Sequence, residues 1–196
     1  MLIHEVPPCH YLRPAAERLI RAAYALSYGA RVSIFPNTLI VLSDKNNKVH
    51  ATAGLRGSSD RYFSEHYLDG GVEAVIGGLT GQRVGRNKIV EVSCLASRSP
   101  AISVKFMREL VLYGEELGFD WAFFTATARL EKLLLRMRLP LITLGKASAN
   151  RVPNPEIWGT YYETDPRVVA FGRKELLPFL MKHKSRAVTC EVRADA

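Results

Sequence analysis

KIVEVSCLASRSPAISVKFMRELVLYGEELGFDWAFFTAT, from Lys88 to Thr127, is the stretch of sequence that decides the fold. The apolar and β-branched residues of Val90–Leu95 predict a buried strand, and Trp121–Thr127 predicts a second one. Between them, apolar residues recur at helical spacing from Pro100 to Gly118. Two buried strands joined by one helix form a βαβ unit, in which the strands run parallel and the connection is right-handed.

The loop between the first strand and the helix is a candidate ligand site. It reads Ser97-Arg98-Ser99-Pro100 and lies at the carboxyl end of a strand, where open α/β sheets bind ligands. Arg98, two hydroxyl groups and a helix N-terminus meet in this loop. Together they favour an anionic guest.

The segments around this unit predict further helices and strands. A polar turn between two strand-like runs indicates a β-hairpin before the unit, and a helix precedes that hairpin. The predicted helices are 15–27, 62–68, 72–79, 129–138 and 174–182, and the predicted strands are 38–43, 48–56, 141–144 and 167–171. We therefore expect one α/β domain over residues 1–196, with a mixed sheet.

Composition and charge narrow the functional class. Apolar residues make up 47% of the 196 residues and charged residues 23%, which is typical of a globular protein. Lys and Arg outnumber Asp and Glu by 27 to 19, giving a net charge of +8. This balance favours an acidic partner, such as a carrier protein, a phosphorylated cofactor, tRNA or anionic lipid, although a solvated basic surface has the same composition.

Other sequence signals make a membrane span, a disulfide framework and a metal site unexpected. No apolar run reaches the roughly 18 residues that a transmembrane helix needs, and the first residues lack the pattern of a secretory signal. Cys9, Cys94 and Cys190 are widely spaced and have no metal-ligand pattern. We expect a cytoplasmic protein without a bound metal.

Four segments resemble the thermostable hemolysin family, a branch of the GNAT acyltransferase superfamily. They are YFSEHYLDGGVEAVI (62–76), IVEVSCLAS (89–97), FDWAFFTAT (119–127) and WGTYYETDPRVVA (158–170). The resemblance implies a GNAT-like fold, with a central βαβ unit whose strands splay apart around an acyl thioester. The family's name implies lysis of red cells, whereas its fold implies acyl transfer.

The resemblance also suggests where the donor binds. GNAT enzymes hold the pyrophosphate of coenzyme A with a glycine-containing loop, but this loop, with Ser97, Arg98, Ser99 and Ala101, has no glycine. Acyl-homoserine lactone synthases and N-acyl amino acid synthases share the fold, lack that loop and accept acyl groups from acyl carrier protein. The basic charge suits such an acidic carrier. The predicted donor is therefore the 4′-phosphopantetheine thioester of acyl carrier protein, with coenzyme A as the alternative.

Candidate catalytic residues lie on the first strand of the unit. Glu91 is a carboxylate in an apolar strand and is the candidate base that removes the proton of the amine, although it also fits a buried strut paired with an arginine. Ser93 is a candidate hydrogen-bond donor to the developing oxyanion. Cys94 is a candidate acyl acceptor, although a small buried residue fits it as well.

Further candidates would contact the donor or the acceptor. Thr125 and Thr127 alternate along the second strand and would face the thioester together. Arg83 and Arg86, near Lys88, would assist Arg98 with an anion, and Trp158, Tyr161 and Tyr162 would form an aromatic wall for the acyl chain or the acceptor. The alternative for the arginines is that they are solvated surface charges. The alternative for the aromatic residues is ordinary core packing.

The favoured hypothesis is an N-acyltransferase that moves an acyl group from a carrier-protein or coenzyme A thioester to a small amine or amino acid. A membrane-active lytic protein is the first alternative, and a transferase that uses aminoacyl-tRNA is the second. An oligomer is also possible, since the C-terminal elements can pack on a neighbouring subunit as well as on their own chain.

Overall fold

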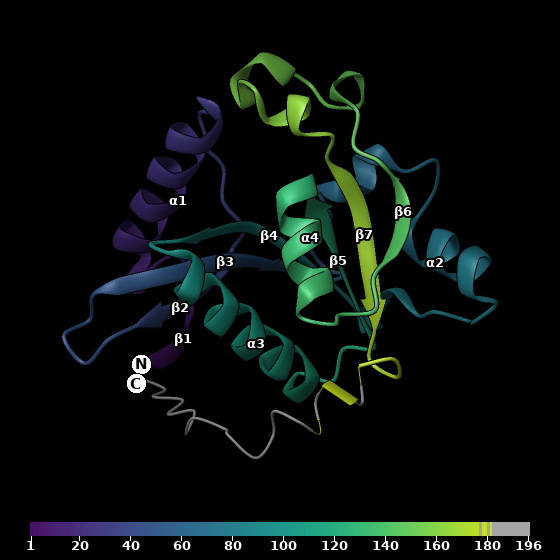
Figure 1. Ribbon diagram of the computed structural model, residues 1–196, viewed down its shortest axis with the longest axis horizontal. Helices are drawn as coiled ribbons and strands as arrows, with labels where there is room; N and C mark the ends of the chain where they lie inside the picture. Colours follow the sequence, from purple (N-terminus) through teal and green to yellow (C-terminus); the bar gives the residue numbers. More distant parts are fainter. Residues whose placement is uncertain (177, 180, 182–196) are drawn as a thin grey trace.

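The computed structural model describes residues 1–176, 178, 179 and 181, and these form a seven-stranded mixed sheet flanked by helices (Figure 1). The strands are β1 Leu2–Val6, β2 Thr38–Ser43, β3 Val49–Arg56, β4 Ile89–Ser97, β5 Trp121–Ala126, β6 Ile142–Lys146 and β7 Arg167–Gly172, in the order β1-β2-β3-β4-β5-β7-β6. The α-helices are α1 Arg13–Tyr28, α2 Val72–Thr80, α3 Pro100–Glu116 and α4 Ala128–Arg136. Short 3-10 helices are η1 Ser64–Tyr67, η2 Arg86–Lys88, η3 Ala149–Arg151, η4 Pro155–Trp158 and η5 Tyr161–Thr164. The predicted α/β class is confirmed.

Helices cover both faces of the sheet because successive strand residues point to opposite sides. Leu39 and Val41 of β2 pack against Ile20 of α1, whereas Ile40 and Leu42 pack against α3. The same alternation along β5 separates the core under α2 from the core under α4. As a result, α1 and α2 lie on one face, and α3 and α4 lie on the other, in front of the sheet in Figure 1.

The helices α3 and α4 each begin with a hydroxyl cap directly after a central strand. Ser99 Oγ accepts a hydrogen bond from the amide of Ile102 at 3.4 Å, and Thr127 Oγ1 accepts one from the amide of Leu130 at 3.3 Å. Such caps satisfy amides that the first helical turn leaves without partners. Both helix N-termini therefore lie at the carboxyl ends of the two parallel strands.

The parallel strands β4 and β5 separate partway along their length. They pair at three positions, from Ile89 opposite Trp121 to Glu91 opposite Phe123. Beyond Glu91, β4 continues to Ser97 without pairing with β5. The predicted parallel βαβ unit and the predicted splaying of its strands are confirmed.

A β-bulge in β4 accompanies this separation. Ser93 pairs with Gly54 and Ala96 pairs with Thr52, so two residues of β4 lie opposite one residue of β3. The extra residue is accommodated at Cys94, whose φ is +52°. Gly54 is required beside the bulge, because a Cβ atom there would lie 2.3 Å from Pro36 Cγ. A bulge bends its strand and redirects the side chains that follow it.

The structure differs from the sequence prediction mainly at the chain ends. Strand β1 was not predicted: it has five residues, is followed by two prolines, and lies at the edge of the sheet beside β2. The helix predicted at 62–68 is the shorter 3-10 helix η1. The helix predicted at 174–182 lies partly outside the described residues, as do the basic residues from Lys182 onward.

Candidate active site

A cavity of about 860 Å³ occupies the gap between β4 and β5 and passes through the sheet. On the α3 and α4 face, its walls are apolar and include Met107, Leu110 and Leu134. On the α1 face, they include Tyr24 of α1 and Tyr161 of η5. The separation of the two strands thus creates a cavity whose walls come from helices on both faces of the sheet.

Many of the predicted site residues line this cavity. They are Ser93, Cys94, Ser97, Arg98, Ser99, Thr125, Thr127 and Tyr161. The others do not line it: Glu91, Ala101, Arg83, Arg86, Trp158 and Tyr162 lie elsewhere. The structure therefore brings together the residues of the two strands and the loop after β4.

Cationic side chains predominate among the charged residues of the cavity wall. Arg98 is exposed and anchored by its Nε, which donates to the carbonyl of Val49 at 2.7 Å. Arg129, Lys132 and Arg136 are exposed on α4 at a spacing that places them on one side of the helix. With the N-termini of α3 and α4, Arg98 and Arg129 make this end of the cavity electropositive, and Lys132 and Arg136 extend the positive charge along α4.

The carboxylates in the cavity wall lie near the other end of α3. Among the described residues, Glu115 and Asp120 are the acidic residues that line the cavity. Arg173 Nη2 donates to Glu115 Oε1 at 3.0 Å. Among the residues that the structure describes, the wall of the aromatic end near Tyr24 and Tyr161 therefore has no acidic side chain.

The hydroxyl groups of the loop after β4 are occupied with local hydrogen bonds. Ser97 Oγ shares a short hydrogen bond with Ser103 Oγ and donates to the carbonyl of Ser99 at 3.2 Å. Ser99 and Thr127 cap α3 and α4. These bonds fix the shape of the loop, and Ala101 is exposed on the first turn of α3.

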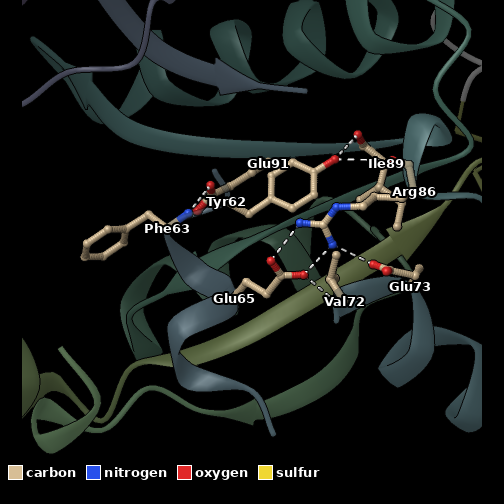
Figure 2. Close-up of polar contacts among 8 residues, drawn as sticks. All are labelled: Tyr62, Phe63, Glu65, Val72, Glu73, Arg86, Ile89 and Glu91. Atoms are coloured by element: carbon tan, nitrogen blue, oxygen red, sulfur yellow. Dashed lines mark hydrogen bonds and ion pairs between the residues drawn. The ribbon is translucent and has the colours of Figure 1, made fainter. Parts of the chain in front are cut away.

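Glu91 is a fully buried carboxylate on the side of β4 that faces η1. Figure 2 shows its Oε2 accepting a hydrogen bond from the Phe63 amide, and its Oε1 accepts another from the Ser64 amide, both at 2.7 Å. Arg56 Nη1 lies 3.7 Å from Oε2. Burial raises the pKa of the Glu91 carboxyl, although hydrogen bonds from Ser64, the charge of Arg56 and the Phe63 amide oppose this shift.

Two residues connect Glu91 with the cavity wall. Arg56 Nη1 donates to Ser93 Oγ at 3.1 Å, and Thr125 Oγ1 donates to Ser64 Oγ at 2.9 Å. Ser93 and Thr125 line the cavity, whereas Arg56 and Ser64 do not. Sequence reasoning missed Arg56 and Ser64, because each reaches Glu91 from a segment about 30 residues away and neither carries a motif.

Cys94 lines the cavity at the bulge. Burial raises the pKa of its thiol to about 11, although the charge of Arg56 opposes this effect. A thiol with this pKa is almost fully protonated at neutral pH and is a poor nucleophile. The chemistry of the site therefore favours the packing interpretation of Cys94.

The predicted aromatic wall is only partly in contact with the cavity. Tyr161 lines it and is buried, and the Trp158 ring lies 5.8 Å from the Tyr161 ring. The Tyr162 hydroxyl instead shares a 2.8 Å hydrogen bond with the Tyr67 hydroxyl. Trp158 also packs against Phe63, whose amide binds Glu91.

Arg86 belongs to a separate polar cluster, which Figure 2 also shows. Its Nη1 lies 2.6 Å from Glu65 Oε1 and 2.7 Å from Glu73 Oε2, and its guanidinium lies over the Tyr62 ring. These contacts tie η1 and α2 to the segment before β4. Arg83 is exposed. The structure thus brings neither arginine to the cavity.

The described residues contain neither a metal-binding cluster nor a helix that could span a membrane. No group of three or more His, Cys, Asp or Glu side chains is placed to hold a metal ion. None of the helices described has the length and apolar character needed to cross a bilayer.

The family model for thermostable hemolysin matches residues 6–176, which is most of the chain. The protein belongs to the thermostable hemolysin family. No curated protein matches the sequence of this family member.

Solved structures share the fold of this thermostable hemolysin family member. FeeM, an N-acyl amino acid synthase from uncultured soil microbes, is 15% identical, with a TM-score of 0.61, and the match covers 91% of this chain and 98% of FeeM. The acyl-homoserine lactone synthase LasI is 12% identical, with a TM-score of 0.57, and the match covers 87% of this chain and 89% of LasI. BjaI, a CoA-dependent acyl-homoserine lactone synthase solved with SAM and isopentyl-CoA, is 12% identical, with a TM-score of 0.58. The match covers 95% of this chain and 91% of BjaI. The predicted GNAT-like fold is confirmed.

Proposed function

We propose that the protein is an N-acyltransferase, which moves an acyl group from a carrier-protein or coenzyme A thioester to the nitrogen of a small amine or amino acid. The observation that carries this proposal is the cavity that passes between the splayed strands, with a buried carboxylate one residue behind its wall. Structures with the same fold are described as N-acyl amino acid and acyl-homoserine lactone synthases, which supports acyl transfer.

The cavity fits the parts of a pantetheine thioester. Beyond Glu91, the backbone edge of β4 that faces β5 is not paired with that strand, and a pantetheine amide can hydrogen-bond there. The apolar space under α3 and α4 suits an acyl chain. The phosphate end would meet Arg98 and the N-terminus of α3.

The charged stripe on α4 favours an acidic carrier protein as the source of the thioester. Arg129, Lys132 and Arg136 are exposed at the cavity wall, and the whole chain carries a net charge of +8. Acidic surfaces are drawn to such a stripe by long-range electrostatic attraction. Coenzyme A remains the second donor, because its phosphates would meet the same cations.

The aromatic end of the cavity favours an acceptor that brings its own carboxylate. Tyr24, Tyr28 and Tyr161 line this end, and among the described residues no acidic side chain does. A cationic acceptor such as SAM, which is present in the BjaI structure, would find no counter-ion in this wall. An amino acid with an apolar side chain would pack against the tyrosines and would bring its own carboxylate as the counter-ion of its amine.

Glu91 is the proposed proton acceptor and Ser93 the proposed donor to the oxyanion. Arg56 donates to Ser93 Oγ, so the Ser93 proton is left for another acceptor, and the neighbouring Cys94 sulfur is a weak one. The thioester oxygen gains negative charge during attack and would draw that proton. The raised pKa of Glu91 suits a base, because basicity rises with pKa.

The proposal is tested by intact-mass spectrometry of the full chain mixed with acyl carrier protein thioesters, or acyl-CoA, and pooled amino acids. We expect the wild type to unload the donor and form an amide. Glu91→Gln should lower this rate by roughly 10²-fold or more, whereas Glu116→Gln, at the exposed end of α3, should not. Donor that stays loaded with every amine would disprove the acyltransferase.

The alternative functions have less support from the described residues. The family description names a hemolysin, and leakage from dye-loaded liposomes with micromolar protein is the direct test of lysis. Use of aminoacyl-tRNA, assembly into an oligomer, a single domain over the whole chain and a cytoplasmic location remain predictions from the sequence. Salt-dependent tRNA binding would support the first of these.

A further inference from the structure

The buried position of Glu91 raises the question of how a proton from the cavity would reach it. The Glu91 side chain is fully buried and does not line the cavity. An amine bound at the splayed strands therefore cannot contact the carboxylate directly. If Glu91 is the base, another group has to carry the proton across one residue of the wall.

We infer that Thr125 and Ser64 form a hydroxyl relay that carries the proton of the acceptor amine from the cavity to Glu91. This inference rests on the proposed acyltransferase function. Thr125 lines the cavity where the strands diverge, and its hydroxyl donates to Ser64 Oγ at 2.9 Å. Ser64 is 2% exposed, and its amide donates to Glu91 Oε1 at 2.7 Å, which holds the residue beside the carboxylate.

The direction of the first hydrogen bond fits transfer toward Glu91. Thr125 donates to Ser64 Oγ, so Ser64 can receive a proton from the cavity side and, held beside Glu91 by its own amide, pass its hydroxyl proton to the carboxylate. A carboxylate oxygen accepts more than one hydrogen bond, so the amides of Phe63 and Ser64 do not exclude the Ser64 hydroxyl. These amides also hold the carboxylate in place.

The second connection between Glu91 and the cavity cannot serve as a relay. Arg56 stands between Ser93 and Glu91, with its Nη1 3.1 Å from Ser93 Oγ and 3.7 Å from Glu91 Oε2. A guanidinium stays protonated and has no lone pair with which to accept a proton. Arg56 is therefore a positioning residue for Ser93 and Glu91. Of the two connections, the one through Thr125 and Ser64 is able to transfer a proton.

The relay balances the reaction. The amine nitrogen forms a bond to the thioester carbon, and the carbon–sulfur bond breaks. The nitrogen gives a proton to Thr125 Oγ1, Thr125 gives its own to Ser64 Oγ, and Ser64 gives its own to Glu91. The leaving thiolate then takes one proton back from Glu91 along the same hydroxyls, which restores the carboxylate and leaves an amide and a thiol.

The relay is tested with the full chain under single-turnover conditions, once the wild type has been shown to form an amide. Thr125→Val keeps the shape but removes the hydroxyl, whereas Thr125→Ser keeps the hydroxyl. We expect Thr125→Val and Ser64→Ala to slow amide formation about 100-fold with unchanged donor affinity, and Thr125→Ser to stay within about threefold of wild type. Thr52→Val is the matched control, because the buried Thr52 hydroxyl has no hydrogen-bond partner among the described residues.

Rates in mixtures of light and heavy water separate a relay from a structural role. Several protons in motion predict a curved dependence of the rate on deuterium content for the wild type and Thr125→Ser, and loss of that curvature in Thr125→Val. Equal rates for the wild type and Thr125→Val, or a Thr125→Ser variant as slow as Thr125→Val, would overturn the relay and leave the acyltransferase standing. A wild type that forms no amide with any donor would remove the proposed function itself.

Discussion

At the scale of single residues, Cys94 allows the covalent and non-covalent forms of acyl transfer to be distinguished. Its thiol lines the cavity, but with a pKa of about 11 only about one thiol in 10,000 is ionised at pH 7. We therefore expect Cys94→Ala to keep the turnover of the wild type within about threefold. Loss of turnover in this variant, together with an acylated protein in the wild-type mass spectrum, would show that Cys94 carries the acyl group.

The pH dependence of the reaction should report Glu91. A base acts in its ionised form, and burial raises the pKa of Glu91, so activity should fall as pH falls through a value above the ordinary 4.5 of a glutamate. Among the groups that interact with Glu91, Arg56 stays charged, and Tyr62 and Cys94, with pKa values near 12 and 11, stay neutral in that range. The acidic limb of kcat/KM measures this pKa. A limb at or below 4.5 would contradict the role.

The sequence indicates individual site residues better than their partners. Glu91 stands out as a carboxylate in an apolar strand, and the residues on both sides of the splay follow from strand periodicity. The contacts of Glu91 with Ser64 and Arg56 depend on tertiary packing, which local spacing does not encode. Arg86 is the converse case, because its basic surroundings in sequence conceal the two carboxylates that it binds.

At the scale of elements, the junction between α1 and η4–η5 holds one wall of the cavity. Gly159 follows η4 at φ +54°, and a Cβ atom there would lie 2.0 Å from the carbonyl oxygen of Tyr28, the last residue of α1. The Thr160 amide donates to that same oxygen at 2.9 Å. Tyr28 and Tyr161, which line the cavity, lie on either side of this junction.

We expect Gly159→Ala to lower the free energy of unfolding by about 2 kcal/mol or more, because it adds a clash to an unfavourable positive φ. Gly78→Ala is the control: it lies in exposed α2 with nothing near its Cβ, and alanine should stabilise the helix by roughly 0.5–1 kcal/mol. Urea titrations of both variants give the two values. A Gly159→Ala variant as stable as the wild type would mean that the backbone of the junction can shift to admit the methyl group without a loss in the free energy of unfolding.

Sequence periodicity predicts elements well where hydrophobic patterns are long and caps are clear. The helices α1 and α3 and the hairpin of β2 and β3 follow their predicted ranges closely. Strand β1 escapes prediction because five residues show too little alternation, and its place in the sheet comes from pairing with β2. The bulge at Cys94 has no local signature, since the residue is not a glycine.

At the scale of the whole molecule, the net charge of +8 predicts how the donor is delivered. Screening shortens the reach of charges from about 10 Å at 0.1 M salt to about 3 Å at 1 M. The KM for an acyl carrier protein should therefore rise several-fold over this range, whereas the KM for a short neutral pantetheine thioester should change less than about twofold. Equal salt effects on both donors would count against docking on the α4 stripe of Arg129, Lys132 and Arg136.

The passage of the cavity through the sheet has a consequence for the order of events. The apolar half lies under α3 and α4 and the aromatic half beside α1, so the proposed donor and acceptor would approach from opposite faces, and neither would have to leave before the other arrives. Initial-rate plots at several fixed concentrations of amine should therefore intersect rather than run parallel. The free thiol and the amide product would then leave through different openings, one on each face of the sheet. An amphiphilic amide could therefore dissociate while the carrier protein is still bound.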